Sequence, residues 1–170
     1  MKKILIKNQT ERGFNLIETL LYIAMLVVIA LAVINSLVTI VTSYKNVKAA
    51  SDMETSATTA FDRMSREIRD ATSIDNADSV FGSNPGVLEI FNGTSTLKFY
   101  VATSTLYLDK NGSTEGPLSL SGITVSNLIF TKITTSNSSA VKIQMTLQSV
   151  VGTVTKSMNF YDTVSLRGSY

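Results

Sequence analysis

The chain has 170 residues and contains neither cysteine nor histidine. This composition excludes disulfide cross-links, thiolate nucleophiles, Cys/His zinc sites and Ser-His-Asp triads. Its 15 basic residues slightly outnumber its 13 acidic ones, but the charges after Tyr44 balance. A neutral domain lacks the basic footprint of a nucleic-acid-binding protein, so we expect no nucleic-acid partner.

The N-terminal region has the charge pattern of a membrane segment. Four basic residues precede a long apolar run: Lys2, Lys3, Lys7 and Arg12. From Thr19 to Tyr44, 26 residues carry no charge. As a helix this run is about 39 Å long, which exceeds the ~30 Å hydrocarbon core of a bilayer. The basic flank predicts a single-pass segment with its N-terminus in the cytoplasm and the C-terminal domain outside.

The apolar run could also belong to a cleaved secretory signal peptide or to an uncut signal anchor. A secretory signal peptide has an apolar core of about 7 to 15 residues and ends at a small-x-small site. The triplet at residues 30–32 (Ala-Leu-Ala) has that form, with cleavage before Val33, but the apolar run continues well beyond it. An uncut signal anchor agrees with the periodicity equally well.

Glu18 places an ionisable group just inside the apolar run. It follows Gly13 and Phe14 within the segment Gly-Phe-Asn-Leu-Ile-Glu. This arrangement resembles the precursors of the type IV pilin and pseudopilin superfamily. The resemblance implies that a prepilin peptidase cleaves after Gly13 and methylates the new Phe14 amine. Glu18 then becomes the fifth mature residue and pairs with the amine of a neighbouring subunit. A glutamate at the headgroups would explain Glu18 alone, but not the Gly-Phe pair at the matching spacing.

The resemblance also implies a location and partners. Residues 1–13 are a cleaved basic leader, and residues 14–44 are a transmembrane helix that forms the core of a filament. The expected partners are the prepilin peptidase, other pilin or pseudopilin subunits, the assembly platform protein and the inner membrane. The protein is then expected in the bacterial cytoplasmic membrane and later in an extracytoplasmic filament, with no cofactor. The machine is left open between type II secretion, a type IV pilus and a competence filament.

Asn35 interrupts the apolar run. Many members of the family that the chain resembles have a proline at the matching mature position. This chain has Asn35 and Ser36 there instead. The difference disfavours a major adhesive pilin. Asn35 is either an interhelical hydrogen-bonding site or a tolerated polar residue.

Residues 45–72 continue the helix in amphipathic form. No glycine or proline interrupts the chain between Gly13 and Gly82, so we expect one helix over residues 14–71. The expected apolar stripe comprises Val47, Ala50, Met53, Ala57, Phe61, Met64, Ile68 and Ala71. The opposite face predicts three i,i+4 ion pairs: Asp62–Arg66, Arg63–Glu67 and Arg66–Asp70. Residues 61–71 also resemble the end of the long helix in J-type minor pseudopilins.

Residues 73–170 are predicted to form a β-rich head. Residues 73–86 are loop-like, and residues 150–155 form a hairpin turn region. Strands are predicted at residues 87–91, 96–102, 105–109, 122–133, 140–150 and 156–167. Asp162 breaks the apolar parity of the last strand. The expected fold is α+β: a long N-terminal helix packed on a C-terminal antiparallel β-sheet head.

The sequence of the β-rich head predicts no metal site and no catalytic group. Residues 109–112 (Asp-Lys-Asn-Gly) contain two oxygen-bearing side chains of the kind found in calcium loops but lack further ligands at regular spacing, so a hairpin turn is predicted. We expect a structural subunit, a minor pilin or pseudopilin, and not an enzyme. The alternatives are a filament-tip adhesin or binding module and an uncleaved signal-anchored protein.

Overall fold

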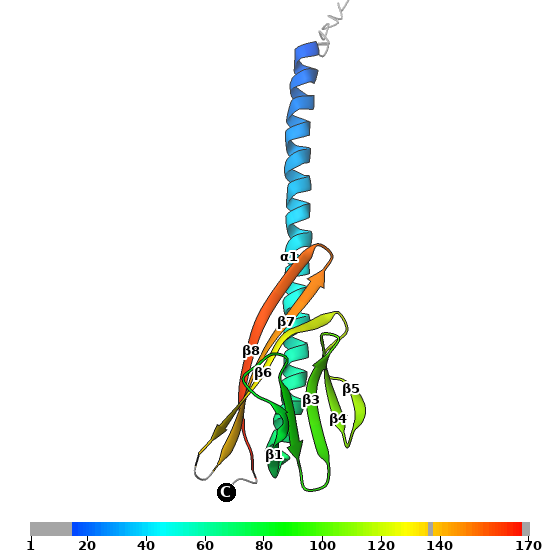
Figure 1. Ribbon diagram of the computed structural model, residues 1–170. Helices are drawn as coiled ribbons and strands as arrows, with labels where there is room; N and C mark the ends of the chain where they lie inside the picture. Colours follow the sequence, from blue (N-terminus) through cyan, green and yellow to red (C-terminus); the bar gives the residue numbers. More distant parts are fainter. Residues whose placement is uncertain (1–14, 136–137, 168–170) are drawn as a thin grey trace, which may run out of the picture. The chain divides into compact units, whose positions relative to one another are not determined.

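The computed structural model describes residues 15–135 and 138–167. The chain divides into two compact units, residues 1–42 and 43–170, which are described separately. The expected residues Gly13 and Phe14 lie outside the described residues. The fold is α+β, as predicted: one long helix and two antiparallel sheets (Figure 1).

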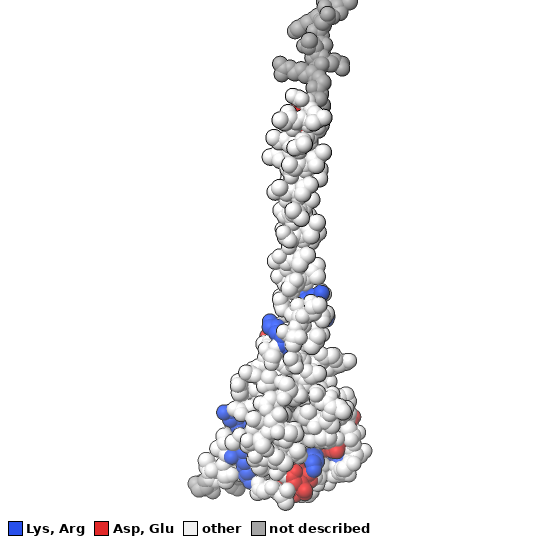
Figure 2. Space-filling model, turned by 45° about the horizontal axis from the view of Figure 1, so that its top comes forward, with Lys and Arg blue, Asp and Glu red and all other residues white. Residues whose placement is uncertain are grey.

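Helix α1 comprises Leu16–Asp70 and belongs to both units. It ends near the predicted position. The Ala71 N–H donates to the Ile68 carbonyl at 3.3 Å and closes the last turn. Every described residue of the first unit is exposed. Figure 2 shows this first part of α1 as almost wholly uncharged surface. The helix is long and apolar enough to cross a membrane.

The first sheet is a five-stranded antiparallel meander. Its strands follow one another in chain order: β1 (Ser73–Val80), β2 (Val87–Phe91), β3 (Thr96–Ala102), β4 (Thr105–Lys110) and β5 (Ser113–Pro117). The prediction of a loop over residues 73–86 was wrong for its first part, which is β1. That strand is mostly exposed and polar, so its sequence has no alternation to reveal it. It forms by backbone pairing with β2 at the edge of the sheet.

The second sheet has three strands, again in chain order: β6 (Ile123–Thr134), β7 (Ser139–Val151) and β8 (Val154–Ser165). Strand β7 is central and shows the predicted alternation of buried and half-buried residues. The turn between β4 and β5 confirms the predicted hairpin, because Asn111 and Gly112 both have positive φ, at 52° and 78°. The sequence did not predict β5, the short partner strand of that hairpin.

The segment between β1 and β2 joins the two sheets along β6. Gly82 and Gly86 donate their N–H groups to the carbonyls of Phe130 and Leu128, at 2.9 and 2.7 Å. A Cβ atom on residue 86 would stand 2.9 Å from the Leu128 oxygen, so only glycine permits this approach. These bonds cover an edge that would otherwise present unpaired backbone groups.

One hydrophobic core lies between the second part of α1 and both sheets. The largest of its fully buried side chains include Phe99, Phe130, Met53, Met64 and Ile68. The predicted helix stripe is largely right, but Val47 is exposed and Ala50 is only half-buried. The buried face includes Ala49, Ser56 and Ala60 instead. Small residues permit close packing of helix on sheet, and the buried face is wider than a stripe of one residue per turn.

Candidate functional site

Glu18 lies in the first turn of α1 and is exposed among the described residues. Its N–H donates to the Asn15 carbonyl at 2.9 Å, so the backbone is helical from this point. The Tyr22 hydroxyl, one turn further on, donates to Glu18 Oε1 at 3.1 Å. A carboxylate near a helix N-terminus is favoured by the helix dipole, and the phenol supplies one hydrogen bond in apolar surroundings.

Tyr22 was not among the residues expected from the sequence. The signal was its spacing, since a tyrosine four residues after a glutamate lies on the same helix face. The Glu18–Tyr22 pair is a polar feature on an otherwise apolar surface. It leaves carboxylate lone pairs available for a further donor, such as an amine.

Asn35 lies on the exposed surface of the same apolar segment. Three nearby side-chain hydroxyls each donate a hydrogen bond to the backbone carbonyl four residues earlier, at 2.9 Å: those of Ser36, Thr39 and Thr42. The Asn35 side chain makes no such bond within the described part of the chain. This difference favours the interhelical interpretation, because an amide in an apolar medium is stabilised by an external partner.

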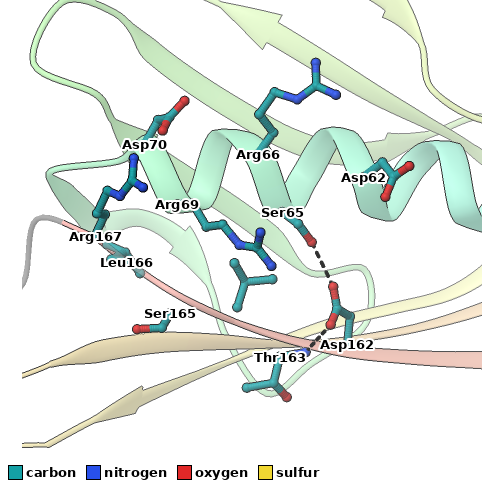
Figure 3. A pocket seen from close by; sticks show the side chains of 11 residues that line it. Asp62, Ser65, Arg66, Arg69, Asp70, Asp162, Thr163, Ser165, Leu166 and Arg167 are labelled. Atoms are coloured by element: carbon teal, nitrogen blue, oxygen red, sulfur yellow. Dashed lines mark hydrogen bonds between the residues drawn. The ribbon is translucent and has the colours of Figure 1, made fainter.

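A second polar region lies between the end of α1 and β8. It is an open groove of about 750 Å³ (Figure 3). The Ser65 hydroxyl donates to Asp162 Oδ2 at 2.8 Å, and the Thr163 N–H donates to Asp162 Oδ1 at 2.7 Å. Asp162 therefore breaks the apolar parity of β8 because its carboxylate faces a helix hydroxyl. Figure 3 shows the Arg69 side chain directed into this groove.

The charges of the groove are mixed. Three arginines and three aspartates line it: Arg66, Arg69, Arg167, Asp62, Asp70 and Asp162. Of the three predicted ion pairs on α1, only Arg63–Glu67 forms, at 2.9 Å. The prediction of Asp62–Arg66 and Arg66–Asp70 was wrong, since neither pair lies within 4 Å in the described structure. Arg63 also reaches Glu115 on β5, at 3.0 Å, and this bond links α1 to the first sheet.

A group of three carboxylates lies at the edge of the first sheet. One oxygen each from Asp75, Asp78 and Glu89 lies within 4.8 Å of the others. Two of these carboxylates already have partners: Asp75 accepts the Ala77 N–H at 2.8 Å, and Glu89 pairs with Lys98 at 3.1 Å. The group is exposed or half-exposed, and we assign no metal to it. The sequence placed Asp75 and Asp78 in a loop and Glu89 in the strand predicted at residues 87–91.

Comparison of the chain with protein-family models, with curated proteins and with solved structures finds no match. The geometry of α1 and the N-terminal sequence pattern are therefore the features that bear on function.

Proposed function

We propose that this protein is a pilin-like or pseudopilin-like subunit that is assembled into a filament through α1. In this proposal it enters the cytoplasmic membrane with its N-terminus inside. A prepilin peptidase cleaves after Gly13 and methylates Phe14. The mature helix then leaves the bilayer and packs among the helices of other subunits, under the action of an assembly platform protein.

The observation that carries the proposal is the position of Glu18. It is a hydrogen-bonded carboxylate one turn into a helix whose next 26 residues are uncharged, and all of that segment is exposed. An apolar surface of this length needs lipid or other helices around it. A carboxylate there is costly without a partner, and the new amine of a neighbouring subunit would be one.

The attraction between Glu18 and an amine would serve mainly to set register. Two charges attract strongly in a low-dielectric filament core, but removing them from water offsets much of that gain. A single buried pair is best at selecting one alignment among many alternatives. Asn35, further along the same surface, would add a second polar contact between helices.

Within this class we favour a minor subunit. Asn35 stands where many major pilins have proline, and the chain lacks the C-terminal cysteine pair that many of them use. Residues 61–71 and the segment that begins at Thr163 resemble minor pseudopilins. The Arg167 N–H donates to the Arg69 carbonyl at 3.1 Å, so these two segments lie side by side in the structure.

The experiment that tests the proposal is the N-terminal sequence and intact mass of the protein purified from its native membrane. We expect a chain that starts at Phe14 and carries one additional methyl group. A chain that starts at Met1 would identify a plain signal anchor, and one that starts at Val33 a secreted protein. Either of these results would refute the filament proposal.

A second experiment isolates Glu18. Glu18→Gln keeps the size of the side chain and removes its charge, while the residues around the cleavage site stay unchanged. We expect normal cleavage and loss of filament incorporation, measured by shearing and sedimentation. Glu54→Gln, at an exposed position of the second part of α1, is the matched control and should assemble normally.

A further inference from the structure

The hairpin that joins β7 and β8 ends beside the first charged residue of α1. Val151 pairs with Val154, which leaves Gly152 and Thr153 as the turn. Lys45 Nζ lies 3.1 Å from the position that a Cβ atom on residue 152 would occupy. Figure 1 shows this end of the β7–β8 hairpin next to α1. The turn thus lies at the level of Lys45.

Lys45 marks a boundary in the sequence. It follows the uncharged run that ends at Tyr44. In a membrane-spanning helix, the first lysine after the apolar run lies at the headgroup level, and tyrosine is enriched there. A turn packed against Lys45 therefore lies at the same level, within reach of the membrane surface.

The side chains around this turn are apolar and basic. Tyr44 and Val47 are 68% and 69% exposed, and Val150, beside the turn, is 61% exposed. Lys156 lies on β8 opposite the buried Ser149, three positions beyond the turn, so it is half-buried on the inner face of the hairpin, whereas Val150 is on the outer face. Lys48 is already paired with Asp52 at 3.3 Å, so Lys45 and Lys156 are the basic groups available. We call Tyr44, Lys45, Val47, Val150 and Lys156 the hairpin surface: they come from α1 near Lys45 and from both faces of the hairpin beside the turn.

We propose that the hairpin surface docks on the anionic headgroups of the membrane that α1 spans. Exposed valines and a tyrosine beside lysines are the composition of an interfacial membrane contact. The surface is continuous in sequence with the apolar segment, so the bilayer is the partner always within reach. The proposal rests on the membrane-spanning part of the proposed function and is independent of cleavage and assembly.

Docking would give the subunit a second membrane contact besides its helix. The domain of residues 43–170 would then have a fixed orientation at the surface before assembly. Extraction of the helix into a filament would also have to break this contact. Lipid charge would in that way influence how readily a subunit leaves the membrane.

The test uses the full chain reconstituted in vesicles at a low protein-to-lipid ratio. Because the chain has no cysteine, Thr153→Cys gives a unique site for an environment-sensitive fluorophore. Thr94→Cys is the matched control: it is an exposed threonine in the turn between β2 and β3. That turn lies at the opposite end of the domain, since a Cβ on Gly93 would stand 3.9 Å from Thr72.

In vesicles that contain phosphatidylglycerol, we expect blue-shifted emission from the label at residue 153 and quenching by brominated lipid. The label at residue 94 should keep the emission of a water-exposed fluorophore. Resistance to carbonate extraction, measured first, shows whether the helix has inserted. Failure to insert would refute the membrane-spanning part of the proposed function together with this proposal. Insertion with a water-like label at residue 153 would refute this proposal alone.

Charge variants test the electrostatic part. Lys45→Gln and Lys156→Gln should each weaken docking about fivefold, the effect of one lysine near an anionic surface. Lys110→Gln, beside the far turn between β4 and β5, should change nothing. A blue shift that rises with protein density and resists quenching by lipid would show contact between copies of the chain. That result would overturn the proposal.

Discussion

Helix α1 has two parts with opposite surfaces. Up to Thr42 it exposes apolar side chains on every face, whereas from Ala49 to Ile68 it buries one stripe and exposes the other. The backbone hydrogen bonds are of the same kind in both parts. The difference lies in what covers the side chains: the second part is covered by the sheets, and the first requires a covering from outside the chain. One helix thus combines a self-sufficient domain with a segment that depends on its surroundings.

The largest effect is expected in the core of the second unit. Phe130→Ala removes a fully buried ring and should lower the free energy of unfolding by about 3–5 kcal/mol. Urea denaturation of the full chain in detergent measures this. Leu26→Ala, in the exposed part of α1, is the control and should leave that transition unchanged. An equal loss for both would mean that the two parts of α1 do not differ as described.

The next prediction compares two side chains of equal exposure. Ile29 and Tyr161 are both 63% exposed, one in the apolar segment and the other on β8. Ile29→Lys should raise the free energy of membrane insertion by about 3 kcal/mol. Tyr161→Lys should not affect insertion.

The measurement uses a translocon insertion reporter whose apolar run is shortened until half of the chains insert. In that reporter the lysine at position 29 should abolish insertion almost completely. Unchanged insertion would contradict the assignment of residues 14–44 to the membrane.

A smaller effect is expected at the groove beside β8. Ser65→Ala removes the hydrogen bond to Asp162 and should lower the free energy of unfolding by about 1 kcal/mol. Asp162→Asn keeps a hydrogen-bond acceptor and should lower the free energy of unfolding by less than Ser65→Ala does. Thermal unfolding of both variants measures the difference, and equal stability of Ser65→Ala and the parent chain would show that the bond contributes nothing.

The smallest effect concerns Arg63, which bridges Glu67 on α1 and Glu115 on β5. Arg63→Met should cost about 0.5 kcal/mol at low salt, because these charges are partly solvated. The loss should shrink in 1 M salt, where screening weakens exposed pairs. Denaturation at both salt concentrations tests this, and a loss independent of salt would point to packing of the side chain instead.

Much of the fold could be predicted because burial in this chain follows simple periods. The helix is revealed by the absence of glycine and proline, and β7 by strict alternation. Strand β1 could not be predicted, because its pairing uses backbone groups and its side chains stay in water. Ala49 and Ala60 were overlooked because the predicted stripe took one residue per turn, whereas the buried face of α1 is wider and includes the neighbours of Ala50 and Phe61.

In the candidate site, too, some residues could be predicted from the sequence and others could not. Glu18 and Asn35 could be identified from the sequence because each is a polar residue in an apolar run. Tyr22 and Asp162 required the structure, since their importance lies in the atoms that they contact. Asp162 pairs with a serine 97 residues earlier, a separation that no local pattern encodes.

The meander order of both sheets has a consequence for folding. Every strand pairs with its neighbour in the chain, so most strand contacts are local in sequence. Domains rich in local contacts fold fast, because little chain entropy is lost before each contact forms. The bonds of Gly82 and Gly86 to β6 span more than forty residues and would form after the hairpins. The two meanders can therefore form early, whereas the core that joins them to α1 depends on contacts between residues as distant as Ser65 and Asp162 and must form last.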